Sequence, residues 1–355
     1  MFSKRLFLGP IILLVFIAVG YPAYWLYAAS LSKTLLKDWV EQQQLNGFTI
    51  RHGDLDTSGF PFFIRLTLAA PSAANSSKGI AWTSEKLQLD LQPWDLRRFR
   101  LEALGLQNIR YGNLTGNEGL TVSTSGIKGV AVINKTGSLA ALSVTVKDMR
   151  IAEAEGRPLL HTSRILADLR RPDNPPRIHT HPSLEISVAA ENINTPILQT
   201  AVLGDRISNI RIKAEFLGAL SGRSLVEALS KWRQSGGTLE IHWLNMVWGA
   251  LDLRANGTVA LDPGMRPLGA LTADIRGYEE TLEALAEANL IRRDLLPASR
   301  IALNLMSKLA DTDRRRVLTV PVTAQNGGLY LGPIKLAKLP VLFTPTPGRL
   351  SAPRD

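Results

Sequence analysis

Residues 6–29 form one continuous hydrophobic run without a charged side chain, and two basic residues precede it. A helix needs about 20 apolar residues to cross the hydrocarbon core of a bilayer, and basic residues beside such a helix favour the cytoplasmic side. Aromatic residues gather at the far end of the run, as they do at membrane–water interfaces. The pattern predicts a transmembrane anchor within residues 1–30, with interface residues at its two ends: Lys4, Arg5, Tyr24, Trp25 and Tyr27.

A cleaved signal peptide is the alternative interpretation of the same segment. Ala28-Ala29-Ser30 offers a small-residue cleavage site of the kind that signal peptidases use. The run exceeds the roughly 7–15 apolar residues of a signal-peptide core, which favours the uncleaved anchor. Under either interpretation the bulk of the chain is exported. With the anchor retained, we expect a single-pass protein of the inner (cytoplasmic) membrane, with most of the chain in the periplasm.

After the anchor, the hydrophobic period changes from that of a helix to that of a strand. Leu31, Leu35 and Trp39 recur at helical spacing, which predicts a juxtamembrane helix over residues 31–46. From residue 47 onward, apolar and polar residues alternate, as they do over residues 87–92. Such alternation is typical of strands with one buried face.

Four prolines within residues 171–182 interrupt the alternation. Proline lacks the N–H that a central strand needs, so this segment is predicted to be a linker between two β-rich halves, residues 47–170 and 183–339. Residues 340–355 are rich in proline and are predicted to be a disordered tail.

The second half also contains helical signals. Apolar stripes near residues 225–232, 282–290 and 301–309 recur at helical spacing and predict three helices. Ser224 and Glu227 form a capping-box pattern before the first stripe, and Asn326-Gly327 predicts a closing hairpin. The predicted fold class is therefore mainly β: an elongated, curled antiparallel sheet in two halves behind an N-terminal helix, with about three helices in the second half.

Charge and composition narrow the classes of function. The formal net charge of the chain is +10, and the basic residues are spread along the sequence. They indicate either a solvated basic surface or attraction to anionic lipid headgroups. An exported chain does not meet chromosomal DNA, so we expect no nucleic-acid partner. The chain has no cysteine, which excludes disulfides, thiol catalysis and thiolate metal sites.

Catalytic patterns are missing from the sequence. It contains neither a Gly-x-Ser-x-Gly elbow nor a glycine-rich phosphate loop. His179 and His181 have metal-ligand spacing but lie in the proline-rich segment, so we expect no metal and no cofactor. An envelope hydrolase is the least favoured hypothesis, and its only candidate carboxylates are Glu185, Glu191 and Glu215.

Two stretches carry a family resemblance. The corner Gly59-Phe60-Pro61-Phe62 joins two predicted strands, and residues 248–261 and 320–336 form glycine-containing hairpins near the end of the chain. Together they resemble the bacterial domain of unknown function 2125 family, and more distantly the AsmA-type envelope proteins. The AsmA-type resemblance implies an inner-membrane-anchored periplasmic body whose sheet shelters lipid acyl chains on an apolar face. Neither resemblance implies a catalytic residue, and a strained corner is the favoured interpretation of Gly59 to Phe62.

An apolar sheet face can itself bind lipid, because burial of acyl chains is non-directional and contributes about 0.8 kcal/mol per CH₂. The sequence predicts a non-enzymatic envelope protein that binds or passes inner-membrane lipids along such a face. The alternatives are that the helices fill the face, or that the chain is a scaffolding module that contacts an envelope protein partner. The candidate groove residues are Leu66, Leu68, Leu239, Ile241, Trp243 and Trp248.

Overall fold

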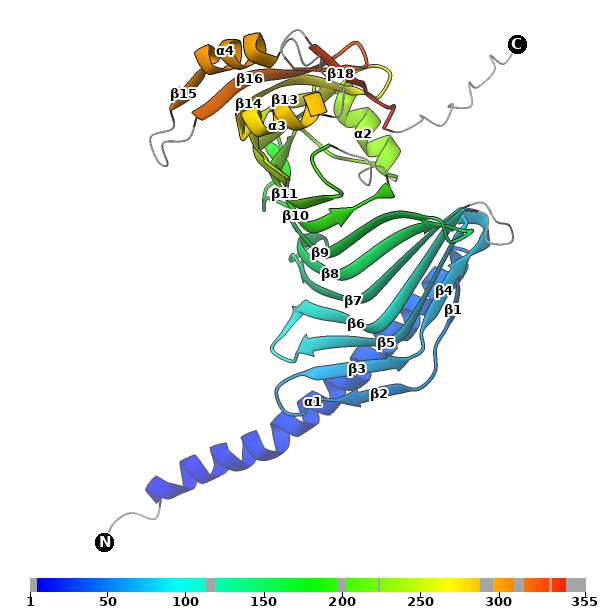
Figure 1. Ribbon diagram of the computed structural model, residues 1–355. Coiled ribbons are helices and arrows are strands. Elements are labelled where there is room, and N and C mark those ends of the chain that lie inside the picture. The colour runs from blue at the N-terminus through cyan, green and yellow to red at the C-terminus, as the bar shows by residue number, and fades with distance from the viewer. Residues whose placement is uncertain are drawn as a thin grey trace, which may run out of the picture. The chain divides into compact units, whose positions relative to one another are not determined.

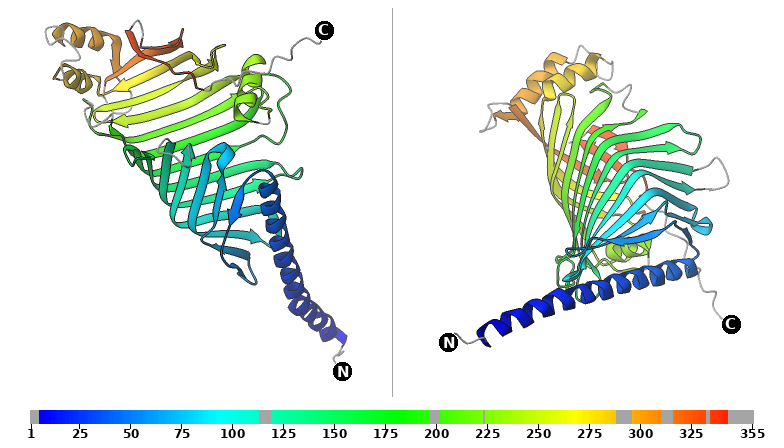
Figure 2. Two further views of the ribbon diagram at one scale, coloured as in Figure 1. Left: turned by 90° about the vertical axis from the view of Figure 1, so that its right-hand side faces the viewer. Right: turned by 90° about the horizontal axis from the view of Figure 1, so that it is seen from below.

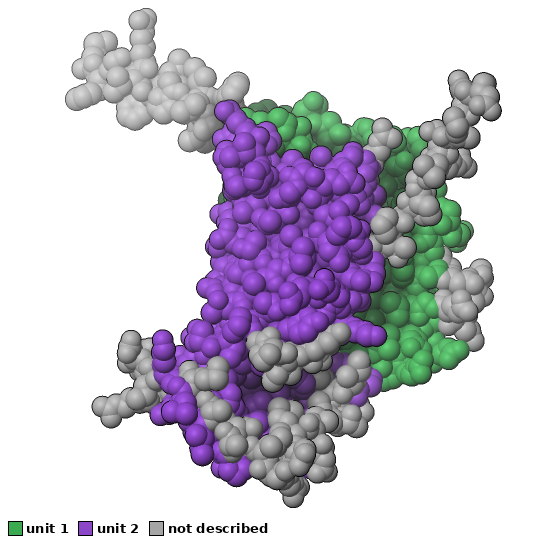
Figure 3. Space-filling view, turned by 90° about the horizontal axis from the view of Figure 1, so that it is seen from above, with its two compact units in different colours: residues 1–164 green, residues 165–355 purple. Residues whose placement is uncertain are grey.

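The computed structural model describes residues 5–112, 119–196, 202–222, 224–287, 296–309, 316–331 and 334–342. The chain divides into two compact units, residues 1–164 and 165–355, which Figure 3 colours separately. Antiparallel strands dominate, and they belong to one large open sheet, so the predicted mainly β class is confirmed. The border between the units lies within a strand, not at the predicted linker, because that strand runs on to Arg170.

In unit 1 a long helix precedes the strands (Figure 1). The predicted anchor and juxtamembrane helix are one continuous helix, followed by a series of strands that lengthen from β5 onward. The elements are α1 (Arg5–Leu45), β1 (Thr49–Arg51), β2 (Leu55–Ser58), β3 (Ile64–Ala69), β4 (Ser72–Asn75), the 3₁₀ helix η1 (Ser76–Lys78), β5 (Ile80–Gln92), β6 (Asp95–Gly112), β7 (Gly119–Ile133), β8 (Leu139–Glu153) and β9 (Pro158–Arg170), which continues past the unit border.

The strand register gives the sheet of unit 1 two faces of opposite character. Cross-strand neighbours point to the same side of a sheet, so the alternation along each strand builds a continuous apolar face, called here the unit 1 apolar face. The other face of the same strands carries polar and charged residues such as Arg65, Asp90 and Arg100. The apolar face consists of three rows that cross from β3 to β8: Ile64–Leu91–Phe99–Ala131–Leu142, Leu66–Leu89–Leu101–Gly129–Val144 and Leu68–Leu87–Ala103–Ile127–Val146.

α1 covers one margin of the unit 1 apolar face (Figure 2). The helix packs against β3 through Trp25, Ala28 and Ala29. Beneath them, Ile64 and Leu66 of β3 have no exposed surface. The two alanines allow the helix backbone to approach β3 closely, while the tryptophan contributes most of the buried area. The described contacts of this core involve β3 and β5 and do not reach β7 or β8.

In unit 2, helices follow or interrupt the strands. Helices are present in all three predicted regions, but the third ends at Met306 because residues 307–309 form strand β15, and residues 288–290 of the second lie outside the described residues. The hairpin at Asn326-Gly327 joins β16 to β17 as predicted. The elements are β10 (Pro182–Asn194), β11 (Arg206–Leu217), α2 (Leu225–Gln234), β12 (Thr238–Trp248), β13 (Leu251–Leu261), β14 (Pro267–Arg276), α3 (Tyr278–Glu287), α4 (Leu296–Met306), β15 (Ser307–Leu309), β16 (Arg316–Gln325), β17 (Gly328–Leu331) and β18 (Ile334–Lys338).

Unit 2 also has an apolar face, built by the same alternation. Two of its rows are Ile186–Ala214–Ile241–Gly257–Leu271–Val322 and Val188–Ile212–Leu244–Ala255–Ala273–Val320. Helices pack on two different margins of this face (Figure 1).

The first of these helices, α2, is fixed by a cap and a tryptophan. Its N-cap Ser224 accepts a hydrogen bond from the Glu227 N–H at 3.2 Å, as the capping-box pattern predicts. Trp232 is 2 % exposed and packs with Leu239 and Met265. At the other margin, Tyr278 of α3 and Leu303 of α4 pack on β14 and β16, with Ile275, Leu318 and Val320 beneath them.

Candidate functional site

The part of the unit 1 apolar face that α1 does not cover is the best candidate for a functional surface. Only its small residues are buried, Ala103 and Ala131 at 4 % and 6 % exposure, whereas Leu101 is 39 % exposed. Phe99 and Val144 are half-buried, as expected of side chains that touch only neighbours in the same sheet. A Cβ built on Gly129, in the middle row, would meet only backbone oxygens at 3.8 and 3.9 Å, so a side chain can begin there without a clash.

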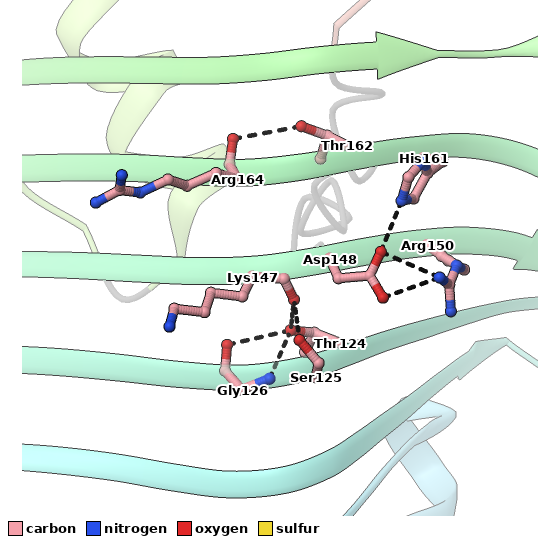
Figure 4. Close-up of polar contacts among 9 residues, drawn as sticks. All are labelled: Thr124, Ser125, Gly126, Lys147, Asp148, Arg150, His161, Thr162 and Arg164. Atoms are coloured by element: carbon pink, nitrogen blue, oxygen red, sulfur yellow. Dashed lines mark hydrogen bonds and ion pairs between the residues drawn. The ribbon is translucent and has the colours of Figure 1, made fainter.

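A row of buried polar side chains bounds this face along the strands. Ser84, Gln107 and Thr124, from β5, β6 and β7, are all at most 7 % exposed. Each donates to backbone carbonyl groups where the register of the strands is irregular, which satisfies groups that a bulge leaves unpaired. Figure 4 shows Thr124, whose hydroxyl donates to the Lys147 carbonyl at 2.6 Å. Beyond this row Trp82 lies on the opposite face, so the apolar face ends here.

Sequence reasoning missed a polar cluster beside this row. His161 Nε2 lies 2.7 Å from Asp148 Oδ1, and an Arg150 guanidinium nitrogen lies 2.9 Å from the other carboxylate oxygen (Figure 4). Asp148 has a φ of +49°, a conformation that aspartate adopts more readily than most residues. The cluster forms because β8, which carries Asp148 and Arg150, lies beside β9, which carries His161. A local sequence motif therefore does not predict it. Its side chains are more than a third exposed, and its contribution to stability is about 0–1 kcal/mol.

The charged face of unit 1 contains a stronger pair. The Arg65 guanidinium donates two hydrogen bonds to the Asp90 carboxylate, at 2.6 and 2.7 Å. This two-point contact raises the pKa of Arg65 above its ordinary value, so its charge is permanent. One row away, Lys128 pairs with Glu102 at 2.6 Å. The polar side of the sheet is therefore held by cross-strand ion pairs, and the other side by apolar contacts alone.

The structure places the predicted groove residues in different environments. Leu66 is fully buried beneath α1, and Leu68 is 6 % exposed, so neither lines an open groove as predicted. Ile241 is 7 % exposed, and Leu239 packs against the core that α2 contributes. Helices therefore cover the apolar face at Leu66 and Leu239.

Trp243 does not lie on the apolar face with Leu239 and Ile241, and that part of the prediction is corrected. In the pairing of β12 with β13, Ile241 lies opposite Gly257, but the next pair is Leu244 with Ala255. The extra residue is a β-bulge, which reverses the alternation along the strand. Trp243 therefore shares the polar face with its partner Lys213. Trp248 is half-buried, and its indole N–H donates to the Gly204 carbonyl at 3.0 Å.

The family corner has a backbone conformation that requires glycine at position 59. Gly59 has a φ of +101°, and a Cβ there would lie 2.4 Å from the Phe63 ring. The Phe60–Pro61 peptide bond is cis. Phe60 and Phe62 are 52 % and 69 % exposed, so the corner presents aromatic rings to solvent.

The predicted interface residues lie partly against the sheet. The Tyr24 hydroxyl donates to the Pro93 carbonyl at 2.6 Å, and the Trp25 indole N–H donates to the Phe63 carbonyl at 3.1 Å. Tyr27 is 66 % exposed. Arg5 begins α1, and Lys4 lies outside the described residues. Across the described stretches of the chain, no helix combines the length and the apolar character needed to cross a membrane.

Within the described ranges, no three histidine, aspartate or glutamate side chains gather as a metal would require. His179 and His181 are exposed. Of the carboxylates considered for hydrolysis, Glu215 lies 3.3 Å from His242, on the polar face of unit 2. The arrangement there is one contact between a carboxylate and an imidazole, both partly exposed.

Comparison with known proteins gives a family and no activity. A family model described as an uncharacterised protein conserved in bacteria, DUF2125, matches residues 25–340. No curated protein matches the chain. No solved structure matches it either.

Proposed function

We propose, from the premise that the chain belongs to the DUF2125 family of bacterial proteins, that it is a non-enzymatic protein of the cell envelope that binds or passes lipid along the unit 1 apolar face. Its members are uncharacterised, so the proposal rests on the geometry of this chain. The observation that carries it is the stretch of that face over β6, β7 and β8 that α1 does not cover, where Leu101 is 39 % exposed and a Cβ on Gly129 would meet no atom closer than 3.8 Å.

The dimensions of the apolar face suit an acyl chain. The three rows extend about 14 Å along the strands, at about 3.4 Å per residue. Each further strand adds about 4.8 Å across the sheet, so the face can accept several methylene groups on each strand. At about 0.8 kcal/mol per buried CH₂, ten methylenes would contribute about 8 kcal/mol before the cost of ordering the chain. Such binding needs no polar recognition group, which agrees with the apolar composition of the three rows.

The place of action belongs to the same proposal. The uncharged run of residues 6–29 supports attachment to the inner membrane, with the sheet on the periplasmic side. Extraction of cell membranes with alkaline carbonate tests this part: we expect the full chain to stay with the membrane fraction. Its release into the soluble fraction would show that no stable attachment exists.

The lipid-binding part of the proposal is tested by a substitution that places a bulky side chain on the unit 1 apolar face. Gly129 and Gly126 are on the same strand, but the register places them on opposite faces. A Cβ on Gly126 would meet one backbone oxygen, at 3.6 Å, so a side chain can begin there without a clash, as at Gly129. Gly129→Phe therefore fills the apolar face, while Gly126→Phe places the same ring on the charged face and is its matched control.

The full chain and both variants would be purified in mild detergent, and bound lipid would be measured by native mass spectrometry and by solvent extraction. We expect phospholipid in the wild type and in Gly126→Phe, and a several-fold loss in Gly129→Phe, with unchanged circular dichroism in all three. Equal lipid in both variants would contradict binding on this face. A wild type free of lipid would favour the scaffolding alternative, in which a protein partner covers the face.

A further inference from the structure

Two loops of unit 1 meet α1 where the helix reaches the sheet. The hydroxyl of Tyr21 donates to the Pro61 carbonyl in the loop between β2 and β3. The hydroxyl of Tyr24, one helical turn later, donates to the Pro93 carbonyl in the turn between β5 and β6. Two hydrogen bonds therefore fix both loops to the same stretch of α1, within the second half of the uncharged run of residues 6–29.

The two loops carry exposed aromatic side chains. Phe60, Phe62 and Trp94 are 52 %, 69 % and 62 % exposed, and Leu96 beside them is 41 % exposed. Scattered exposed apolar residues are normal, but a contiguous group marks an interaction site. Tryptophan is enriched at the membrane–water interface, and phenylalanine and leucine are typical of the apolar side of segments that lie in that interface.

Behind these rings lies a cavity of about 510 Å³ on the charged face of the sheet. Its lining includes Phe62 and Trp94 at the rim, with Arg65, Arg98 and Arg100 on the strands. Asp90 also lines it and is held by both nitrogens of Arg65. Arg98 and Arg100 are exposed and form no ion pair with any described residue, so three arginines face one carboxylate.

This chemistry selects an anionic phosphate group. Arginine binds phosphate with two parallel N–H groups, and basic side chains near a membrane are attracted to its anionic headgroups. The aromatic rim adds apolar contact at the depth of the headgroups. A free phosphate would use the arginines alone and would make no use of Phe62 and Trp94. The Phe60 ring, by contrast, already packs against Tyr21 and Trp25 of α1.

We infer that this arginine–aromatic pocket holds the phosphate of an anionic lipid headgroup at the membrane surface, beside the point where α1 reaches the sheet. The inference rests on the proposed function in one respect, that the chain works at a membrane. It does not require an acyl chain on the unit 1 apolar face.

The absence of cysteine permits a site-specific test with the full chain. Leu96→Cys places a fluorescent label at an exposed position at the start of β6, two residues after Trp94 and two before Arg98, which both line the cavity. Glu155→Cys places the same label in the exposed turn between β8 and β9, at the opposite end of the strands. Each labelled chain is reconstituted in nanodiscs of phosphatidylcholine alone or of phosphatidylcholine mixed with phosphatidylglycerol, and quenching by aqueous iodide is measured.

We expect phosphatidylglycerol to protect the label at position 96 and to leave the label at position 155 unchanged. Arg98→Gln or Arg100→Gln should each weaken the protection about fivefold, and the double variant should abolish it. Arg98→Lys with Arg100→Lys, which keeps the charge but loses the planar fork, should fall between. Arg110→Gln, an exposed arginine farther along β6, should behave as the wild type.

Equal quenching in both lipid compositions would overturn the inference, as would full protection in the double glutamine variant. Inorganic phosphate is added in a second arm without phosphatidylglycerol. Protection by phosphate alone would overturn the lipid source and assign the pocket to a free anion. If phosphatidylglycerol does not protect the label at position 96 although phospholipid co-purifies with the wild type, this inference alone is refuted. If the label is protected but Gly129→Phe retains as much lipid as Gly126→Phe, only the acyl-chain proposal is refuted.

Discussion

Unit 1 covers its apolar face with one helix at one margin, whereas unit 2 covers its own with three helices at two margins. In unit 1 the large buried hydrophobic residues are near α1, such as Ile64 and Leu66, and the buried hydrophobic residues of β6 and β7 are the alanines Ala103 and Ala131. In unit 2 the buried set extends over β13, β14 and β16 beneath α3 and α4, and a second core forms beneath α2. The same strand pattern thus leads to a largely filled core in one unit and a partly open face in the other.

The difference teaches that alternation makes an apolar face but does not decide what covers it. Coverage depends on where the helices lie along the chain. The α-helices of unit 2 lie between its strands in the sequence, whereas in the described part of unit 1 the α-helix α1 precedes all the strands and only the short η1 lies between two of them. A ligand is therefore expected on unit 1 in preference to unit 2.

The largest effects on stability are expected from the buried tryptophans of the covering helices, Trp25 of α1 and Trp232 of α2. Trp25 and Trp232 are 7 % and 2 % exposed, and each indole N–H donates to a carbonyl at a strand end. Changing either to alanine should lower the free energy of unfolding by about 3–5 kcal/mol. Denaturant unfolding measures the loss, and hydrogen exchange should locate it in β3 and β5 for Trp25→Ala and in β11 and β12 for Trp232→Ala.

The control for both changes is Trp39→Ala, since that tryptophan of α1 is 55 % exposed. It should shift stability by about 0.5 kcal/mol or less, as surface substitutions do. If Trp25→Ala were no more costly than Trp39→Ala, α1 would not be a structural cover of unit 1.

The glycines in the middle of the two faces should respond in opposite ways. Gly257 of unit 2 has a φ of +150°, and a Cβ there would lie 2.3 Å from the Ala270 carbonyl oxygen. Gly257→Ala should therefore destabilise the chain by about 1–3 kcal/mol. Gly129→Ala should raise stability by about 0.4–1 kcal/mol, because its conformation and space allow a methyl group. Thermal unfolding of the two variants side by side measures both signs, and a comparable loss at Gly129 would show that the unit 1 face is closed.

The smallest effect is expected at the N-cap of α2. This helix lies between β11 and β12 in the sequence and covers part of the unit 2 apolar face. Ser224→Ala removes the acceptor for the Glu227 N–H and should cost about 1 kcal/mol. Ser224→Asn retains an acceptor and should remain within a few tenths of a kcal/mol of the wild type. Chemical denaturation resolves the two, and an equal loss in both would show that the hydrogen bond is not the source of the effect.

Sequence reasoning succeeded wherever the controlling interaction is local. The alternation over residues 87–92 recurs in β5, the Ser224 pattern caps α2, and Asn326-Gly327 closes the β16–β17 hairpin. Each of these features depends on residues within one turn or one strand, where periodicity and backbone preference act directly. The family corner was also recognised from contiguous residues.

Tertiary structure alone decided which apolar side chains became core and where charges converged. A bulge turned Trp243 to the polar face, and α1 closed the space over Leu66. Register joined Arg65 to Arg100, 35 positions away in the sequence, in the same cavity wall. One residue of register reverses every side chain in a strand, and no local pattern encodes the helix that lies over it. The sequence by itself therefore determined that the sheet has an apolar side, and packing determined which part of that side is open.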